Sequence, residues 1–136
     1  MLKKKILVVD DEPDFLKMIK IRLEANEYDV VVATNGKEAL EQVKDHNPDA
    51  VLLDILMPGI DGLEVLKRIR KANAKLPVFI ITAFSNEERF ELAKKFNASG
   101  FIVKTGDLKR EVENITNVLR LSDKFKNEKG GFFKPF

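Results

Sequence analysis

Residues 50–62 read AVLLDILMPGIDG, and this stretch indicates how the rest of the chain is built. A run of apolar residues leads directly into Asp54, and two turn-forming pairs, Pro-Gly and Asp-Gly, then break the chain. A continuous apolar run bounded by turn residues is typical of a strand that is covered on both faces. Asp61 can cap a following helix, because Glu64 stands three residues further on. The stretch therefore predicts a buried strand, a loop and a helix.

Four further apolar runs share this character: KILVVD (5–10), DVVVA (29–33), PVFIITA (77–83) and GFIVK (100–104). Helical patterns separate the five runs, and one more follows the last run. Their expected starts are Pro13 in an opening turn, caps at Asn35 and Ser85 with Glu38 and Glu88, and Asp107 before Leu108, Val112, Ile115 and Leu119. Alternating strands and helices predict βα units on a parallel sheet, which is an α/β domain.

Composition narrows the class of protein. The 136 residues, 44% of them apolar, fit one compact domain. A net charge of +2 argues against a strongly cationic nucleic-acid binder, and the lack of cysteine excludes disulfides and thiolate metal sites. The N-terminal apolar run is too short for a signal peptide or membrane span, so we expect a cytoplasmic protein with no direct contact to nucleic acid or membrane.

The pattern changes after Leu121. We expect the domain to cover residues 1–121 and residues 122–136 to form a C-terminal tail rich in Lys, Gly and Pro, with no effector domain. The tail carries Phe132, Phe133 and Phe136, which could dock on the domain, bind a partner or remain unstructured.

Polar residues close four of the five apolar runs. The first run ends in Asp10 and Asp11, the third in Asp54, the fourth in Thr82 and the fifth in Lys104. In parallel α/β sheets ligands bind at these carboxyl ends of the strands. Each residue alone has a plain structural interpretation, such as a helix cap, a turn acid, a strand threonine or a surface lysine.

The combination favours chemistry over structure. Crowded carboxylates repel one another, and Mg²⁺ relieves that repulsion through one or two carboxylates, water and phosphate oxygens. Lys104 supplies a positive charge for a phosphoryl group, and Thr82 supplies a hydroxyl donor. These are the components of a phosphoryl-transfer site, and an aspartate can accept the group as an acyl phosphate. We therefore predict that Asp54 is the nucleophile.

The chain resembles a response-regulator receiver domain (CheY-like) of two-component signalling. The resemblance rests on VVDDEP (8–13), LLDILMPGIDG (52–62), ITA (81–83) and FIVK (101–104), which occur in this order from residue 1 to about residue 121. It implies a flavodoxin-like (βα)5 fold with strand order 2-1-3-4-5, for which a chemotaxis receiver is a standard example. The alternation of strands and helices alone does not determine that order.

The resemblance also implies roles for the residues. Asp54 would be the phosphoacceptor, Asp11 would bind Mg²⁺ directly, Asp10 would hold its water shell, and Asp54 and the main-chain carbonyl of Leu56 would complete the protein ligands. Lys104 would pair with the phosphoryl oxygens. The donor would be a phosphohistidine on a sensor histidine kinase or a His-phosphotransfer protein of a phosphorelay.

Signal output is implied in the same way. Thr82 would move to bond the phosphoryl group as Phe101 rotates inward, and a downstream protein would bind the face formed by the fourth helix, the fifth strand and the fifth helix. The chain would act as a stand-alone regulator by protein contact, with a phosphorylation-dependent dimer as an alternative. It would not be an enzyme except toward its own aspartyl phosphate. His46 is expected to be an ordinary surface residue in a helix-to-strand connection.

Two positions depart from the family pattern. Thr105 follows Lys104 where members usually carry a proline, commonly in a cis bond, and we predict a trans peptide because a non-proline cis bond costs roughly 2.5–4 kcal/mol. Leu56 and Phe84 are apolar and flank the route of a hydrolytic water. Since neither can orient water by hydrogen bonding, we hypothesise slow autodephosphorylation.

Three other classes fit the sequence less well. An aspartyl phosphatase of the haloacid-dehalogenase type carries Asp-x-Asp, whereas DIL at 54–56 lacks the second acid. A pseudo-receiver tends to lose an acid or the lysine, and all are present here. A dinucleotide or flavin carrier lacks its Gly-rich loop after the first strand.

Overall fold

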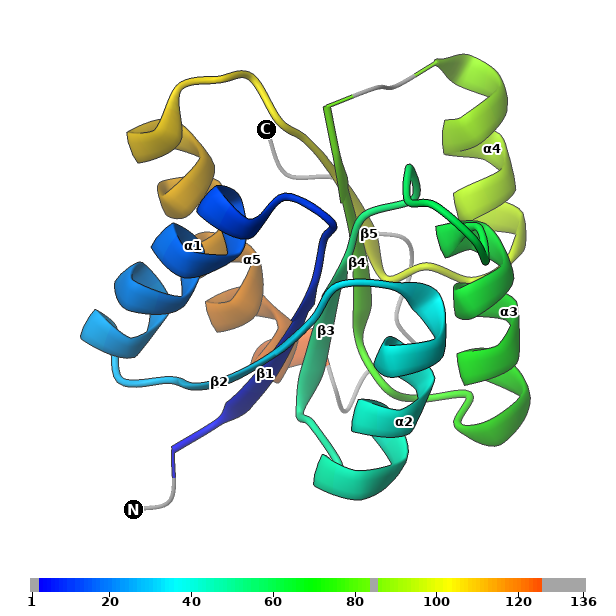
Figure 1. Ribbon diagram of the computed structural model, residues 1–136, viewed down its shortest axis with the longest axis horizontal. Coiled ribbons are helices and arrows are strands. Elements are labelled where there is room, and N and C mark those ends of the chain that lie inside the picture. The colour runs from blue at the N-terminus through cyan, green and yellow to red at the C-terminus, as the bar shows by residue number, and fades with distance from the viewer. Residues whose placement is uncertain (1–2, 84–85, 126–136) are drawn as a thin grey trace.

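The computed structural model describes residues 3–83 and 86–125, and its centre is a five-stranded parallel sheet (Figure 1). The strands are β1 (Lys5–Val9), β2 (Asp29–Ala33), β3 (Ala50–Leu53), β4 (Val78–Thr82) and β5 (Gly100–Val103). Their order is β2-β1-β3-β4-β5. The α/β, doubly wound, flavodoxin-like fold is therefore confirmed.

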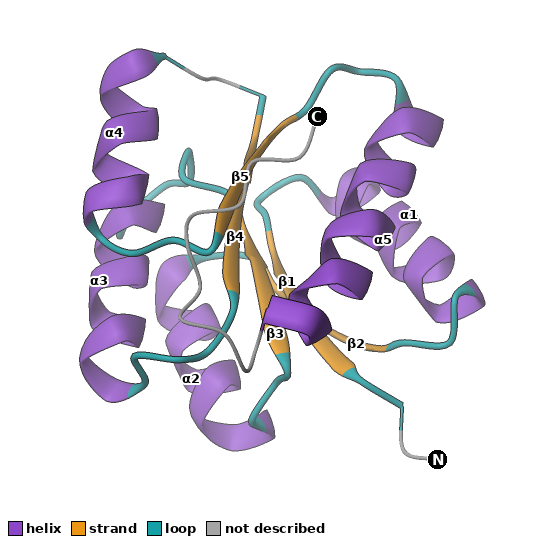
Figure 2. Cartoon of the chain, turned by 180° about the vertical axis from the view of Figure 1, so that it is seen from behind, coloured by secondary structure: helices purple, strands orange, loops and turns teal. Residues whose placement is uncertain are grey.

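Helices cover both faces of the sheet, as the two opposite views show (Figures 1 and 2). One face carries α1 (Pro13–Ala25) and α5 (Leu108–Phe125), and the other carries α2 (Gly36–His46), α3 (Gly62–Ala72) and α4 (Glu87–Lys95). The sheet thus separates two hydrophobic cores.

Burial on both faces explains why the strands are apolar without interruption. Successive strand residues point to opposite faces, so Ile6 and Val8 pack against α1 and α5, whereas Leu7 and Val9 belong to the core beneath α2, α3 and α4. All four are buried. Each such side chain contributes roughly 1.5–3 kcal/mol of burial free energy to the fold.

The helix starts agree with the sequence at four of the five predicted positions, including Asp107, whose Oδ1 accepts the N–H of Arg110 in the first turn of α5 at 3.2 Å. Pro13 is the first residue of α1, and the Asn35 and Asp61 side chains accept backbone N–H groups from the first turns of α2 and α3. The cap expected at Ser85 is corrected to Asn86, whose side chain caps α4; Ser85 itself lies outside the described residues. Ser and Asn are both good caps, so adjacent candidates are separated only by the backbone path into the helix.

Two further expectations concern the C-terminal ends of α2 and α5. His46 is exposed but is the last residue of α2 and not part of a connection. Helix α5 continues to Phe125, past the change of pattern at Leu121, whereas the tail phenylalanines lie outside the described residues. No described helix is both long and apolar enough to cross a membrane.

Candidate functional site

The polar residues predicted at the strand ends meet at one edge of the sheet. Asp10 follows β1, Asp54 follows β3, Thr82 ends β4 and Lys104 follows β5. The neighbouring ends are level, because Val9 pairs with the last residue of β3. The N–H of Asp54 donates to the carbonyl of Val9 (3.0 Å) and that of Lys104 to the carbonyl of Thr82 (2.8 Å). Backbone hydrogen bonding therefore fixes the points from which these side chains project.

Three carboxylates form a cluster there. Asp10, Asp11 and Asp54 each offer an oxygen, and these oxygens all lie within 4.8 Å of one another. Asp10 and Asp54 are buried, whereas Asp11 is exposed at the mouth of the site. Carboxylate oxygens from partly open positions are the ligands that Mg²⁺ prefers, since this ion retains several waters. The donor set therefore fits the expected magnesium ion.

Lys104 is the cation that faces these acids. Its ammonium bonds the Asp10 carboxylate, and its Nζ lies 3.4 Å from Glu12 Oε1 and 3.6 Å from Asp54 Oδ2. It also lies 4.0 Å from the ring centroid of Phe15, in cation–π contact. Burial alone would lower the pKa of Lys104, but the hydrogen bond and charge of Asp10, with the charges of Asp54 and Glu12, outweigh it and raise that pKa.

Opposing interactions act on the pKa of the Asp54 carboxyl. Burial is the largest and raises the pKa of its carboxyl, and the negative charge of Asp10 adds to the rise. The N–H of Leu56, which donates to Asp54 Oδ1 at 2.9 Å, acts in the other direction together with Lys104 and the Thr82 hydroxyl, without cancelling it. Asp54 is thus a desolvated carboxylate, and a cation or proton placed beside it lowers its electrostatic cost.

The two residues expected to switch lie on neighbouring strands. Thr82 is fully buried at the end of β4, and its side chain hydrogen bonds Asp54. Phe101 on β5 is 2% exposed, so its ring points into the core. Phe90 of α4 packs edge-on against it, with ring centroids 5.5 Å apart. Phe101 is therefore in direct contact with α4.

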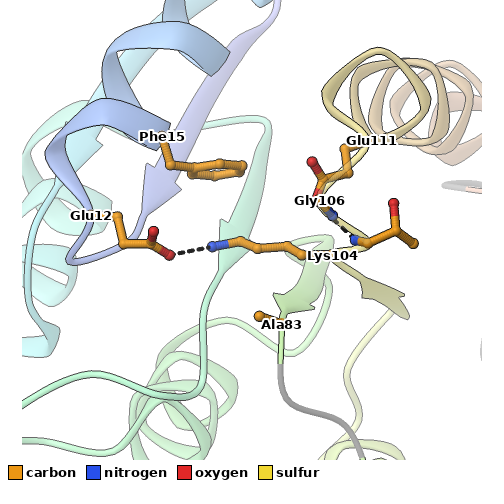
Figure 3. A pocket seen from close by; sticks show the side chains of 7 residues that line it. Glu12, Phe15, Ala83, Lys104, Gly106 and Glu111 are labelled. Carbon is orange, nitrogen blue, oxygen red and sulfur yellow. Dashed lines mark hydrogen bonds and ion pairs between the residues drawn. The ribbon is translucent and has the colours of Figure 1, made fainter.

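A cleft of about 400 Å³ opens beside Lys104 (Figure 3). Its lining includes three side chains that sequence reasoning missed: Glu12, Phe15 and Glu111. In Figure 3 the Glu12 carboxylate reaches the Lys104 ammonium beneath the Phe15 ring. A signal for Glu111 was present, because it stands three residues after Leu108, at a helical spacing that otherwise carries apolar core residues.

The departures from the family pattern have different outcomes. The Lys104–Thr105 peptide is trans, as predicted, since the described residues contain no cis bond. Leu56 is 38% exposed to solvent. Phe84 lies outside the described residues. Slow hydrolysis stays a prediction.

Comparison with known proteins places these features in a family. The sequence profile of the response regulator receiver domain matches residues 6–116. The chain is 33% identical over 122 residues to the alkaline phosphatase synthesis transcriptional regulatory protein PhoP of Bacillus subtilis, which covers 90% of this chain and 51% of that protein. It is 36% identical to the response regulator ArlR of Staphylococcus saprophyticus, over 85% of this chain and 52% of that one. The chain thus spans about half the length of these relatives.

Solved structures agree with the fold. A CheY-like receiver domain protein of Methanospirillum hungatei is similar with a TM-score of 0.81 at 26% identity, covering 90% of this chain and 98% of that one. The response regulator TrrA of Thermotoga maritima, in complex with Mg(2+)-BeF, is similar with a TM-score of 0.74 at 38% identity, covering 85% and 98%. A magnesium ion is therefore present in a structure of similar fold.

Proposed function

Since the chain belongs to the response regulator receiver domain family of two-component signalling, we propose that Asp54 is its phosphoacceptor. The observation that carries the proposal is the meeting of Asp10, Asp11 and Asp54 with Lys104 at one edge of the sheet. The donor would be a phosphohistidine of a sensor histidine kinase or a His-phosphotransfer protein, so the domain would act in the cytoplasm beside it.

Asp54 would act as the nucleophile. One of its carboxylate oxygens forms a bond to phosphorus as the phosphorus–nitrogen bond of the donor breaks, and the imidazole nitrogen keeps the electron pair of that bond. The Leu56 N–H holds Oδ1 at 2.9 Å, which restricts rotation of the carboxylate. Positioning and charge neutralisation are the main contributions a protein makes to this reaction.

Asp10, Asp11, Asp54 and the carbonyl of Leu56 would hold a magnesium ion. When bound, this ion supplies positive charge that offsets the repulsion between the phosphoryl group and the acids. With Asp10 engaged in that way, Lys104 would exchange its bond to Asp10 for the incoming phosphoryl oxygens. Its distance of 3.6 Å from Asp54 Oδ2 supports this role.

Output would pass through Thr82 and Phe101. The Thr82 hydroxyl would leave Asp54 for a phosphoryl oxygen, and the contact between Phe101 and Phe90 would carry the change to α4. A downstream protein that prefers one of the two arrangements would shift the equilibrium by that preference. We propose protein contact at α4, β5 and α5 as the output, with a phosphorylation-dependent dimer as the alternative.

The domain would catalyse only its own phosphorylation and dephosphorylation, so we do not propose an enzyme acting on other substrates. Stand-alone action is likewise a proposal, because this chain matches only about half the length of the relatives named above. A transcription regulator built from this receiver and a further domain would use the same phosphoacceptor.

Intact-mass analysis after incubation with acetyl phosphate tests the phosphoacceptor. We expect one phosphoryl adduct on the wild-type chain with Mg²⁺ and none with EDTA or in Asp54→Asn. Asp45→Asn, which alters an exposed acid of α2, is the matched control and should retain the adduct. A folded wild-type domain that binds Mg²⁺ but gains no adduct would contradict the proposal and favour a pseudo-receiver.

A further inference from the structure

Glu111 is a buried acid in the first turn of α5, and only 4% of its surface is exposed. Its Oε1 accepts the backbone N–H of Thr105 at 3.1 Å and that of Gly106 at 3.5 Å. Among the described residues no Lys or Arg side chain pairs with it. Its partners are thus the two backbone amides that directly follow Lys104.

A buried carboxylate at this position requires a reason. Desolvation opposes the charged form, and apolar side chains fill the neighbouring core positions of α5. Two N–H donors and the positive end of the helix dipole offset that cost. The donor at Thr105 exists because this residue is not a proline. Glu111 therefore accepts a backbone N–H that a proline at position 105 would not supply.

Apart from Glu111, the loop is held by its own short-range hydrogen bonds: the Asp107 N–H donates to Thr105 Oγ1 and the Arg110 N–H donates to Asp107 Oδ1, both at 3.2 Å. Thr105, Gly106 and Asp107 are all exposed, and Gly106 has a left-handed φ of +87° with nothing packed where a Cβ would be. On its N-terminal side the Lys104 N–H bonds the Thr82 carbonyl, which is the last sheet bond of this segment. Glu111 thus provides the next fixed point after the sheet.

Lys104 depends on both fixed points. Its side chain must span from the end of β5 to Asp10 and Asp54, which are the groups it shares with the phosphoryl site. A rotation of the Lys104–Thr105 peptide plane, which carries the Thr105 N–H, would change the Lys104 backbone from which the side chain projects toward those oxygens. Displacements of about 1 Å can slow a positioned reaction by up to about 10²-fold.

We infer that Glu111 is a positioning residue for phosphoryl transfer, acting through the backbone amides of Thr105 and Gly106 to hold Lys104 at the phosphoryl site. This inference rests on the proposed function of Asp54. It extends the site to an acid of α5 that would touch neither the phosphoryl group nor the metal.

Two variants separate hydrogen bonding from packing. Glu111→Met keeps a long side chain but has no oxygen acceptor, whereas Glu111→Gln keeps an acceptor oxygen in place of Oε1. Glu113→Gln removes an exposed carboxylate from the same helix and serves as the control. Circular dichroism at the assay temperature establishes that each variant is folded.

A general loosening of the domain would weaken binding of Mg²⁺ and of beryllofluoride alike, whereas loss of the Glu111 acceptor should change them differently. We expect Glu111→Met to bind beryllofluoride, in the presence of Mg²⁺, about tenfold more weakly and to accept phosphate from phosphoramidate about tenfold more slowly. Its affinity for Mg²⁺ alone should not fall, because Lys104 competes with the ion for Asp10. Glu111→Gln and Glu113→Gln should remain within about twofold of wild type.

Amide hydrogen exchange gives a measurement that needs no variant. The N–H of Thr105 should exchange more slowly in the wild-type domain than the N–H of exposed Asn73. The Asn73 N–H donates to the carbonyl of Ile69 at the fraying C-terminal end of α3. Unprotected exchange at Thr105 would overturn the inference even if Glu111→Met failed to fold.

The outcomes separate this inference from the function on which it rests. Wild-type binding by Glu111→Met, or an equal loss in Glu111→Gln, would overturn the role of the acceptor while leaving Asp54 as the phosphoacceptor. A wild-type domain that takes no phosphoryl group from any donor would overturn both. A selective loss in Glu111→Met would establish the positioning role.

Discussion

Gly62 offers a test of how closely the phosphoacceptor depends on helix packing. It is the first residue of α3 and lies against the backbone that follows β3. A Cβ added at Gly62 would lie 2.3 Å from the carbonyl oxygen of Asp54 and 2.5 Å from Cα of Ile55. Both are backbone atoms, so Gly62→Ala cannot be accommodated by rotating a side chain.

The size of the effect follows from the overlap. Moving the Asp54 oxygen from 2.3 Å to a tolerable 3.0 Å requires a shift of 3.0 − 2.3 = 0.7 Å. Overpacking of this kind costs about 1–3 kcal/mol, and the better helix propensity of alanine returns up to about 1 kcal/mol. We therefore expect a net loss of about 1–2 kcal/mol in unfolding free energy. Because the shift displaces Asp54, phosphorylation should also slow by about tenfold or more.

Urea unfolding and intact-mass phosphorylation kinetics measure the two effects. Gly59→Ala is the matched control in the same loop, because Gly59 has a φ of +81° and nothing within 4 Å of its would-be Cβ. Its left-handed backbone should cost about 1–2 kcal/mol without displacing Asp54. The reasoning is refuted if Gly62→Ala phosphorylates at the wild-type rate, or if Gly59→Ala slows as much.

Four further changes have definite expected outcomes. Folding raises the pKa of Asp54, so above pH 3.8 the folded state binds more protons at this carboxyl than the unfolded state, and stability falls as pH rises. In urea titrations with EDTA, Asp54→Asn should therefore be more stable than wild type at pH 7 and should lose that advantage as pH falls toward 4. Thr82→Ala should still be phosphorylated, yet its affinity for a partner, measured by calorimetry, should no longer change on phosphorylation. A change equal to that of wild type would count against the switch. Leu56→Asn should shorten the phosphoprotein lifetime followed by mass spectrometry, because its amide can orient water, and an unchanged lifetime would end the idea of slow hydrolysis. Arg70→Met should lose about 2 kcal/mol in urea unfolding, because the Arg70 guanidinium donates to three backbone carbonyls between α3 and β5; a loss under about 0.5 kcal/mol would show that these bonds add little.

Tertiary structure decided the contacts around Lys104. Its hydrogen bonds to Asp10 and Glu12 join residues 94 and 92 positions apart, and the ring of Phe15 comes from the first turn of α1, which follows these acids. Nothing in the local pattern of DDEP distinguishes an acid that caps a helix from one that pairs with a lysine on another strand. The same holds for the contact of Gly62 with the Asp54 backbone, which depends on how α3 packs beneath β3.

Local sequence patterns predicted the alternation of strands and helices and the strand-end residues Asp10, Asp54, Thr82 and Lys104, because apolar periodicity and turn chemistry are local properties of the chain. The strand order was available only through the family resemblance, since alternation is compatible with several orders. Only the tertiary structure assigned a partner to Glu111. An acid at an apolar position of a helix is a sign of a specific interaction, but its partner is set by the path of the loop that the helix packs against.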